Sequence, residues 1–206
     1  MSLVILLPLV TGLFRFKRIP VSWRPIIYLL FIGLINELVS FIFLYNHSAI
    51  PNNIYCLFDF VFLFWQFRNW GNILRNEKLF YSLLILLCLI WLAENVLYQR
   101  IGMYSPIYRI AYSLTLILLA VNQMNWVIVN DTSNIYKNPV FIVCIAIIVF
   151  YAYKILMEIF YYYAPGEKMV QHNIFNLEAY VNIVFNILLA IAILCIPRKK
   201  DFTLQL

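Results

Sequence analysis

Two side chains of opposite charge, Lys154 and Glu158, lie one helical turn apart inside a long apolar run. Together with Ile147, Tyr151 and Tyr161 they recur at steps of four, three, four and three residues. On an α-helix this spacing places all five side chains on one face. Two interpretations are open: the lysine and the glutamate stabilise each other as an i,i+4 pair near a helix end, or they belong to a polar stripe that lines a cavity.

Charged side chains interrupt the other apolar runs, and they fall in the same half of their runs once the connections are assigned to two sides. The opposite halves hold only amides such as Asn122 and Asn125. Charges are costly in hydrocarbon, so such residues face protein or trapped water and mark candidate functional sites. Interhelical hydrogen bonding that only holds the helices together is the alternative. The candidate ligand-binding residues are Glu37, Asp59, Glu94, Arg109, Lys154, Glu158, Glu178 and Asn182.

The composition places these residues in a membrane protein. The 206 residues are 65% hydrophobic and only 12% charged, whereas soluble domains are about 25% charged. We therefore expect one transmembrane helical domain over residues 1–206, with no soluble domain attached. The net charge of +6 is then a signal of membrane orientation and not of nucleic-acid binding.

Apolar runs predict seven transmembrane helices, because helices satisfy their own backbone hydrogen bonds in lipid. The first run is short and contains Pro8 and Gly12, so a re-entrant or interfacial segment is the alternative, which would leave six crossings. The expected spans are Leu3–Phe14, Pro25–Tyr45, Ile54–Trp70, Leu79–Leu97, Pro106–Val129, Pro139–Tyr163 and Asn176–Ile196.

Basic residues predict the orientation. Only Arg100 and Lys168 lie in the connections of one side, against eleven on the other. Because Lys and Arg accumulate in cytoplasmic loops, we expect the C-terminus in the cytoplasm, the N-terminus outside, and the protein in the inner membrane of a cell. The eleven are Arg15, Lys17, Arg18, Arg24, Arg68, Arg75, Lys78, Lys137, Arg198, Lys199 and Lys200.

Motifs for known chemistries are few. His47 and His172 are the only histidines, and the four cysteines form no CxxC pair, so we expect no metal site. Neither a phosphate-binding loop nor a nucleophile elbow occurs, and we expect no cofactor. Carboxylate pairs such as Glu37 with Asp59 could still perform acid–base chemistry on a lipid.

Four stretches resemble a family of small, uncharacterised, seven-span bacterial membrane proteins with no assigned activity. They are LINELVSF (34–41), NNIYCLFDFVFLFWQF (52–67), IYKNPVFIVCIAIIVFYAYKILMEIF (135–160) and VNIVFNILLAIAILCIPRKKDF (181–202). The similarity covers most of the chain but rests on pattern. It implies a seven-span topology and supplies no site residues.

The sequence favours a ligand-binding or sensory membrane module with a polar cavity open to the outer face. A membrane enzyme that acts on a lipid and a carrier of small solutes or protons are the alternatives, so catalysis is undecided. The expected partners are the lipid bilayer, a small-molecule or lipid ligand from outside, and an accessory protein. For Lys154 we predict an amine within hydrogen-bond reach of Glu37 or Glu158.

Overall fold

The computed structural model describes residues 3–43, 49–98, 101–102, 105–130, 135–163 and 168–197. Within these ranges, the side chains of residues 3, 41–43, 161–163 and 168–175 are not described, so Tyr161 of the predicted stripe lies outside the described side chains.

Seven α-helices account for most of the described chain, which confirms the all-α prediction. The short elements are the 3₁₀ turns η1 (Leu3–Ile5), η2 (Val21–Trp23), η4 (Ile73–Arg75) and η6 (Ile135–Lys137), and the π-helical turn η5 (Ala93–Leu97) that continues α4. The helices are α1 (Leu6–Arg15), α2 (Arg24–Phe43), α3 (Ile50–Trp70), α4 (Glu77–Leu92), α5 (Pro106–Asn130), α6 (Pro139–Tyr163) and α7 (Lys168–Cys195).

Two helices begin a full turn or more before the expected spans. Helix α3 begins at Ile50, with Pro51 in its first turn. A proline is well tolerated there, because the amides of the first turn form no hydrogen bond within the helix. Helix α7 begins at Lys168, although the expected span begins only at Asn176. Polar residues extend a helix beyond the hydrocarbon without leaving a hydropathy signal, which explains both differences.

Within the described residues, five segments are long and apolar enough to cross a membrane. They are Val21–Ser40, Glu77–Leu97, Pro106–Asn130, Pro139–Phe160 and Asn176–Cys195. Helix α1 is apolar but short. Helix α3 is long enough but more polar, because it contains Asn53, Asp59 and Gln66. The chain is a polytopic membrane helical protein, and the number of crossings stays a prediction.

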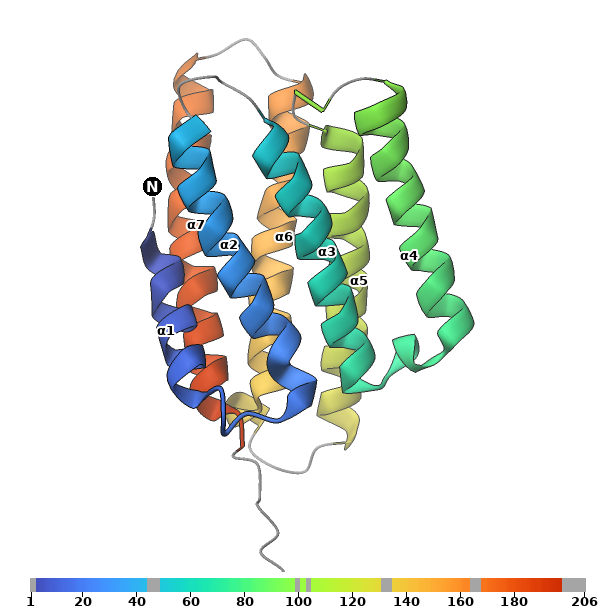
Figure 1. Cartoon of the computed structure of the whole chain (residues 1–206), viewed down its shortest axis with the longest axis vertical. Helices are drawn as coiled ribbons and strands as arrows, with labels where there is room; N and C mark the ends of the chain where they lie inside the picture. Colours follow the sequence, from blue (N-terminus) through green and yellow to red (C-terminus); the bar gives the residue numbers. More distant parts are fainter. Residues whose placement is uncertain are drawn as a thin grey trace, which may run out of the picture.

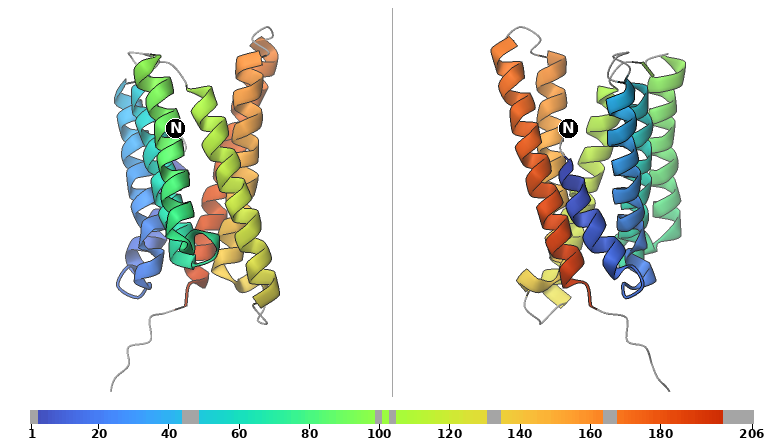
Figure 2. Two further views of the ribbon diagram at one scale, coloured as in Figure 1. Left: turned by 90° about the vertical axis from the view of Figure 1, so that its right-hand side faces the viewer. Right: turned by 60° about the vertical axis from the view of Figure 1, so that its left-hand side comes forward.

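The long helices run side by side along one axis (Figure 1). Their contacts follow the chain around the bundle, from α2 to α3, α3 to α5, α5 to α6 and α6 to α7, and α1 closes the ring by packing on both α7 and α2. Helix α4 packs against α5 and α3 from outside. Helix α1 begins part-way up the bundle and occupies only the lower part of the gap between α2 and α7, which diverge above it (Figure 2).

The helix ends beside the basic connections lie at the lower end of Figure 1, where α1, α3, α5 and α7 end and α2, α4 and α6 begin. Arg198, Lys199 and Lys200 lie outside the described residues. Arg15 fixes α1 at the lower end, since its guanidinium donates hydrogen bonds to the carbonyls of Ile193 (2.6 Å), Leu194 and Ile196 (2.9 Å) at the end of α7. A cation at this position also complements the helix dipole.

Candidate functional site

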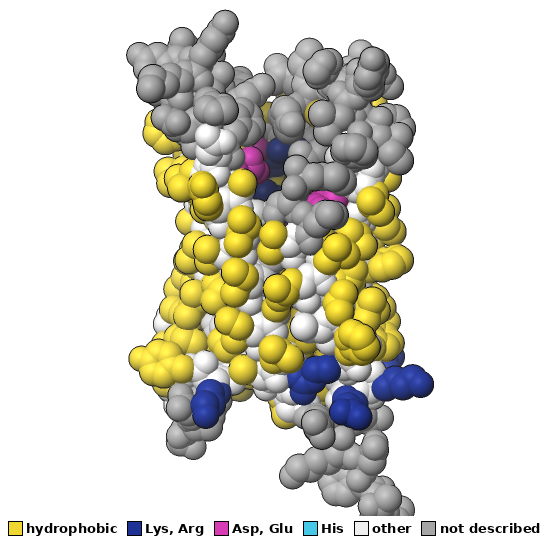
Figure 3. Space-filling model, turned by 90° about the vertical axis from the view of Figure 1, so that its left-hand side faces the viewer, with side chains coloured by type: hydrophobic (Ala, Val, Ile, Leu, Met, Phe, Trp, Pro, Cys, Tyr) yellow, Lys and Arg dark blue, Asp and Glu magenta, His cyan; other side chains and the backbone are white. Residues whose placement is uncertain are grey.

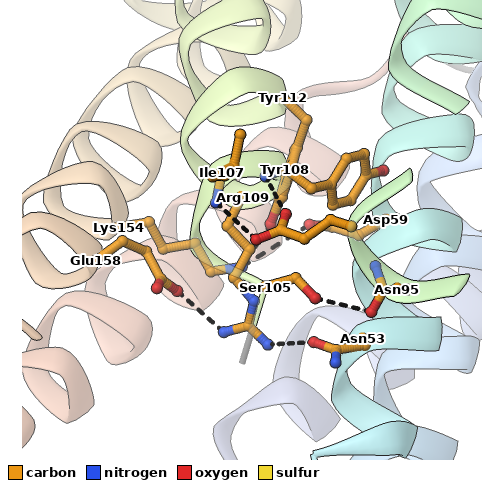
Figure 4. Close-up of polar contacts among 11 residues, drawn as sticks. Asn53, Asp59, Asn95, Ser105, Ile107, Tyr108, Arg109, Tyr112, Lys154 and Glu158 are labelled. Carbon is orange, nitrogen blue, oxygen red and sulfur yellow. Dashed lines mark hydrogen bonds and ion pairs between the residues drawn. The ribbon is translucent and has the colours of Figure 1, made fainter. Parts of the chain in front are cut away.

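An ion pair with little exposure joins the first turn of α5 to α6 (Figure 4). Arg109 Nη1 lies 3.0 Å from Glu158 Oε1, and the two side chains are only 8% and 13% exposed. Arg109 Nη2 also donates a hydrogen bond of 3.2 Å to Asn53 Oδ1 on α3. The guanidinium therefore binds three helices together through charge-assisted hydrogen bonds.

Glu94 is buried and caps the start of α5. Its Oε2 accepts a hydrogen bond of 2.7 Å from the amide of Tyr108, and its Oε1 accepts one of 3.2 Å from the amide of Ile107. The first amides of a helix have no partner within the helix, and the helix dipole favours an anion there. Both oxygens of this predicted ligand-binding residue therefore accept hydrogen bonds from the backbone of α5.

The π-helical turn η5 explains how two successive polar side chains can both be buried. Glu94 and Asn95 lie within this turn and are 3% and 1% exposed. Asn95 Oδ1 accepts a hydrogen bond of 2.7 Å from the hydroxyl of Ser105, next to the start of α5. In this turn α4 departs from α-helical spacing, and the departure directs both side chains towards α5.

A second charged cluster joins α3 to α6 deeper in the bundle. Asp59 Oδ2 accepts a hydrogen bond of 2.7 Å from the hydroxyl of Tyr151 and lies 4.0 Å from the amine of Lys154. The amine donates a hydrogen bond of 3.0 Å to the hydroxyl of Tyr112 on α5. It also lies 5.1 Å from the ring centre of Phe150 and 5.4 Å from that of Tyr151, distances at which a cation is attracted to a ring.

This cluster corrects the predicted pairing of Lys154. Among the residues described, the lysine pairs with neither Glu37 nor Glu158. Asp59 lies opposite Lys154 instead, and Glu158 forms an ion pair with Arg109. The interpretation that Lys154 and Glu158 stabilise each other as an i,i+4 pair is therefore wrong. The common inward face of Ile147, Tyr151, Lys154 and Glu158 is confirmed, since the first two are fully buried and the last two are partly buried.

A small cavity lies beside the Asp59–Lys154 pair. It has a volume of about 50 Å³ and is lined from four long helices and from Ile5 of η1. Its polar walls are Tyr55, Asp59, Lys154, Asn182 and Asn186. A water needs roughly 10–15 Å³ and two to four polar partners, so the cavity can hold a few waters or a polar group of similar size.

The amides of α7 line this cavity as a stripe. Asn186 Nδ2 donates hydrogen bonds of 2.9 Å to both the backbone carbonyl and the side-chain carbonyl of Asn182. The surface view from the side of α1, α2 and α7 shows acidic and basic side chains recessed near the upper end, above a belt of hydrophobic side chains (Figure 3). Charged side chains near the upper end are thus visible on this lateral face of the bundle (Figure 3).

Two predicted acids lie at the border of this region and form no ion pair with a described residue. Glu37 on α2 is half-buried, and its Oε2 is buried without a hydrogen bond to the described part of the chain. Glu178 on α7 is also half-buried. No three His, Cys, Asp or Glu residues gather into a group that could hold a metal ion, as far as the structure describes the chain.

The predicted residues therefore separate into four groups: Arg109 with Glu158, Asp59 with Lys154 and Asn182 at the cavity, Glu94 as a helix cap, and Glu37 with Glu178 at the border. Sequence reasoning missed Asn53 because it was assigned to a connection outside the third span. Pro51 could have shown that the helix begins earlier and includes Asn53.

No family model, curated protein or solved structure matches this chain. The resemblance to small seven-span bacterial proteins stays a prediction.

Proposed function

We propose that this chain is a ligand-binding membrane module that holds a small polar group in the cavity beside Asp59 and Lys154. The cavity itself carries the proposal: at about 50 Å³ it is smaller than a usual small-molecule site, but several polar groups converge on it among apolar helices, as they do in such sites. Its walls offer a carboxylate, an ammonium group, two amides and a phenol within one small volume. The chemistry of these groups suits recognition by hydrogen bonds.

The charged groups around the cavity favour binding over catalysis. Asp59 accepts from Tyr151 and faces Lys154, and Glu158 is held by Arg109, so these charges already have partners. A general base needs to reach a substrate proton within about 3 Å. Glu37, with one buried oxygen that has no hydrogen bond to a described residue, favours the second candidate function, acid–base chemistry on a lipid.

We also propose that this site opens to the outer face of the inner membrane of a bacterial cell, in a bundle of seven crossings with the N-terminus outside, or six if α1 does not cross. The accumulation of basic residues at the lower end supports a cytoplasmic C-terminus. Thiols introduced at Asn52 and Asn130 in a background without the native cysteines test this orientation. An impermeant reagent added to intact cells should label the first and not the second, and the reverse pattern would contradict the proposal.

Native mass spectrometry tests the binding function. The full chain, extracted in mild detergent, should carry a bound molecule of defined mass that the variant Asn182→Phe lacks, because the ring fills the cavity. Ile191→Phe is the matched control, since Ile191 is on the same helix and 44% exposed. A bound mass that persists in Asn182→Phe, or no bound mass in the unaltered protein, would argue against a ligand in this cavity.

A further inference from the structure

An apolar groove runs along the surface of α2 and α3 that points away from the bundle interior, and it is separate from the polar cavity. It encloses about 390 Å³ and is lined mainly by Ile32, Ile35, Val39, Ile54 and Phe58. Three of these side chains, Ile35, Ile54 and Phe58, are 40–43% exposed. The volume is within the usual range for small-molecule sites, about 300–1,000 Å³. Because α2 is one of the five apolar segments, the groove faces hydrocarbon.

One side chain lines both the groove and the cavity. Tyr55 on α3 lines the groove and also lines the cavity beside Asp59 and Lys154. It lies against Gly33 of α2, where an added Cβ would be 3.3 Å from the Tyr55 hydroxyl and only 2.6 Å from Ile5 Cδ1. The glycine leaves the room that the phenol occupies. Tyr55 is thus a wall shared by the apolar groove and the polar cavity.

The cavity suits a compact head group without charge. Its lysine and its aspartate already face each other, so a charged ligand would leave one charge uncompensated in a buried place, which is costly. A hydroxyl both donates and accepts hydrogen bonds, and the cavity offers donors and acceptors side by side. The volume of about 50 Å³ is suitable for a hydroxyl-bearing group and small for a phosphate-bearing head.

We propose that the ligand is a single-chain amphiphile whose hydrocarbon chain lies in the α2–α3 groove and whose uncharged hydroxyl head passes Tyr55 into the cavity. This inference rests on the proposed function, because it names the class of ligand for the same cavity. Its defining feature is that groove and cavity hold two parts of one molecule.

Binding of mono-oleoylglycerol to the purified full chain, followed by native mass spectrometry, tests the inference. Ile35→Trp fills the groove and Asn182→Phe fills the cavity, and each should weaken binding about tenfold or more, as the loss of a well-fitted pocket does. Leu89→Trp on the outer face of α4 is the matched control for the groove variant, since Leu89 is 57% exposed, and it should bind like the unaltered protein. Oleic acid, which carries a charged head on the same chain, should bind more weakly.

Each other outcome overturns the inference in a recognisable way. Loss of binding in Ile35→Trp alone would mean that the groove binds a hydrocarbon chain independently of the cavity. The proposed function of the cavity would then still be tested by the bound mass described above. Loss in Asn182→Phe alone would mean a small ligand without a chain in the groove. Equal binding by all variants would mean unspecific lipid contact. A dimer that Ile35→Trp dissociates would show that a second copy covers the groove. If Ile35→Trp fails to fold, Ile35→Phe replaces it with the same expectations.

Discussion

Removal of the Arg109 guanidinium should strongly destabilise the protein. In the variant Arg109→Met the carboxylate of Glu158 stays buried, at 13% exposure, without the cation that lies 3.0 Å away. Asn53 Oδ1 loses its donor as well. Removal of one partner of a buried ion pair typically costs about 3–5 kcal/mol, because the remaining charge is uncompensated. In a chain of this length that corresponds to a fall in the unfolding midpoint of roughly 6–20 °C.

Thermal unfolding in detergent, followed with a thiol-reactive dye, measures this effect. Cys56 and Cys144 are buried and become reactive only when the bundle opens. Arg68→Met is the matched control, because Arg68 forms an ion pair of 3.2 Å with Glu77 in which the two side chains are 32% and 73% exposed. An exposed pair contributes about 0–1 kcal/mol, so this midpoint should hardly move.

The double variant Arg109→Met with Glu158→Met separates an uncompensated charge from a simple loss of contacts. It should recover most of the loss, since a buried pair replaced by apolar side chains is often neutral. The remaining deficit should be about 1 kcal/mol, for the hydrogen bond to Asn53. The reasoning is refuted if the double variant is as unstable as the sum of the single variants, or if Arg109→Met and Arg68→Met shift the midpoint equally.

Three further variants test other parts of the structure. Glu94→Ala should lower stability by about 1–2 kcal/mol, because the start of α5 loses its cap, and an unchanged unfolding midpoint would exclude that role. Arg15→Ala should speed hydrogen exchange of the last amides of α7 and lower stability by about 1–3 kcal/mol. Faster exchange in α1 alone would contradict a stabilising role of the Arg15 hydrogen bonds to the end of α7. Gly33→Leu should displace Ile5 and cost about 1–3 kcal/mol through overpacking, whereas a variant of normal stability would show that η1 does not pack there.

The helices and the inward faces could be predicted from the sequence, but the pairs of side chains could not. Hydropathy and spacing identify an apolar run and the direction of Tyr151 or Lys154 within it. They do not specify the order of helices around the bundle. Several acids were predicted at similar depth, so the partner of Lys154 depends on which helix faces α6. The helices that pack against α6 are α5 and α7, and Asp59 reaches the lysine from α3 across the interior of the bundle.

Local departures from helical spacing were the second obstacle. The π-helical turn at the end of α4 has no signature in a periodic pattern, yet it directs Glu94 to the backbone of α5. The sequence placed this carboxylate correctly near the end of its segment. It could not distinguish a helix cap from a ligand-binding acid, because both are buried carboxylates in the same part of a span.

The hydrogen bonds from Arg15 of α1 to the end of α7 have a consequence for biosynthesis. Arg15 and the carbonyl of Ile193 are 178 residues apart in the chain. At about 5–20 residues per second, α7 leaves the ribosome roughly 10–35 seconds after α1. Throughout this interval α1 lacks the helix on which it packs most extensively in the finished bundle. The ring can close only when synthesis of α7 is complete, so a chain that stops before α7 leaves α1 without its final partner and accessible to quality-control proteases.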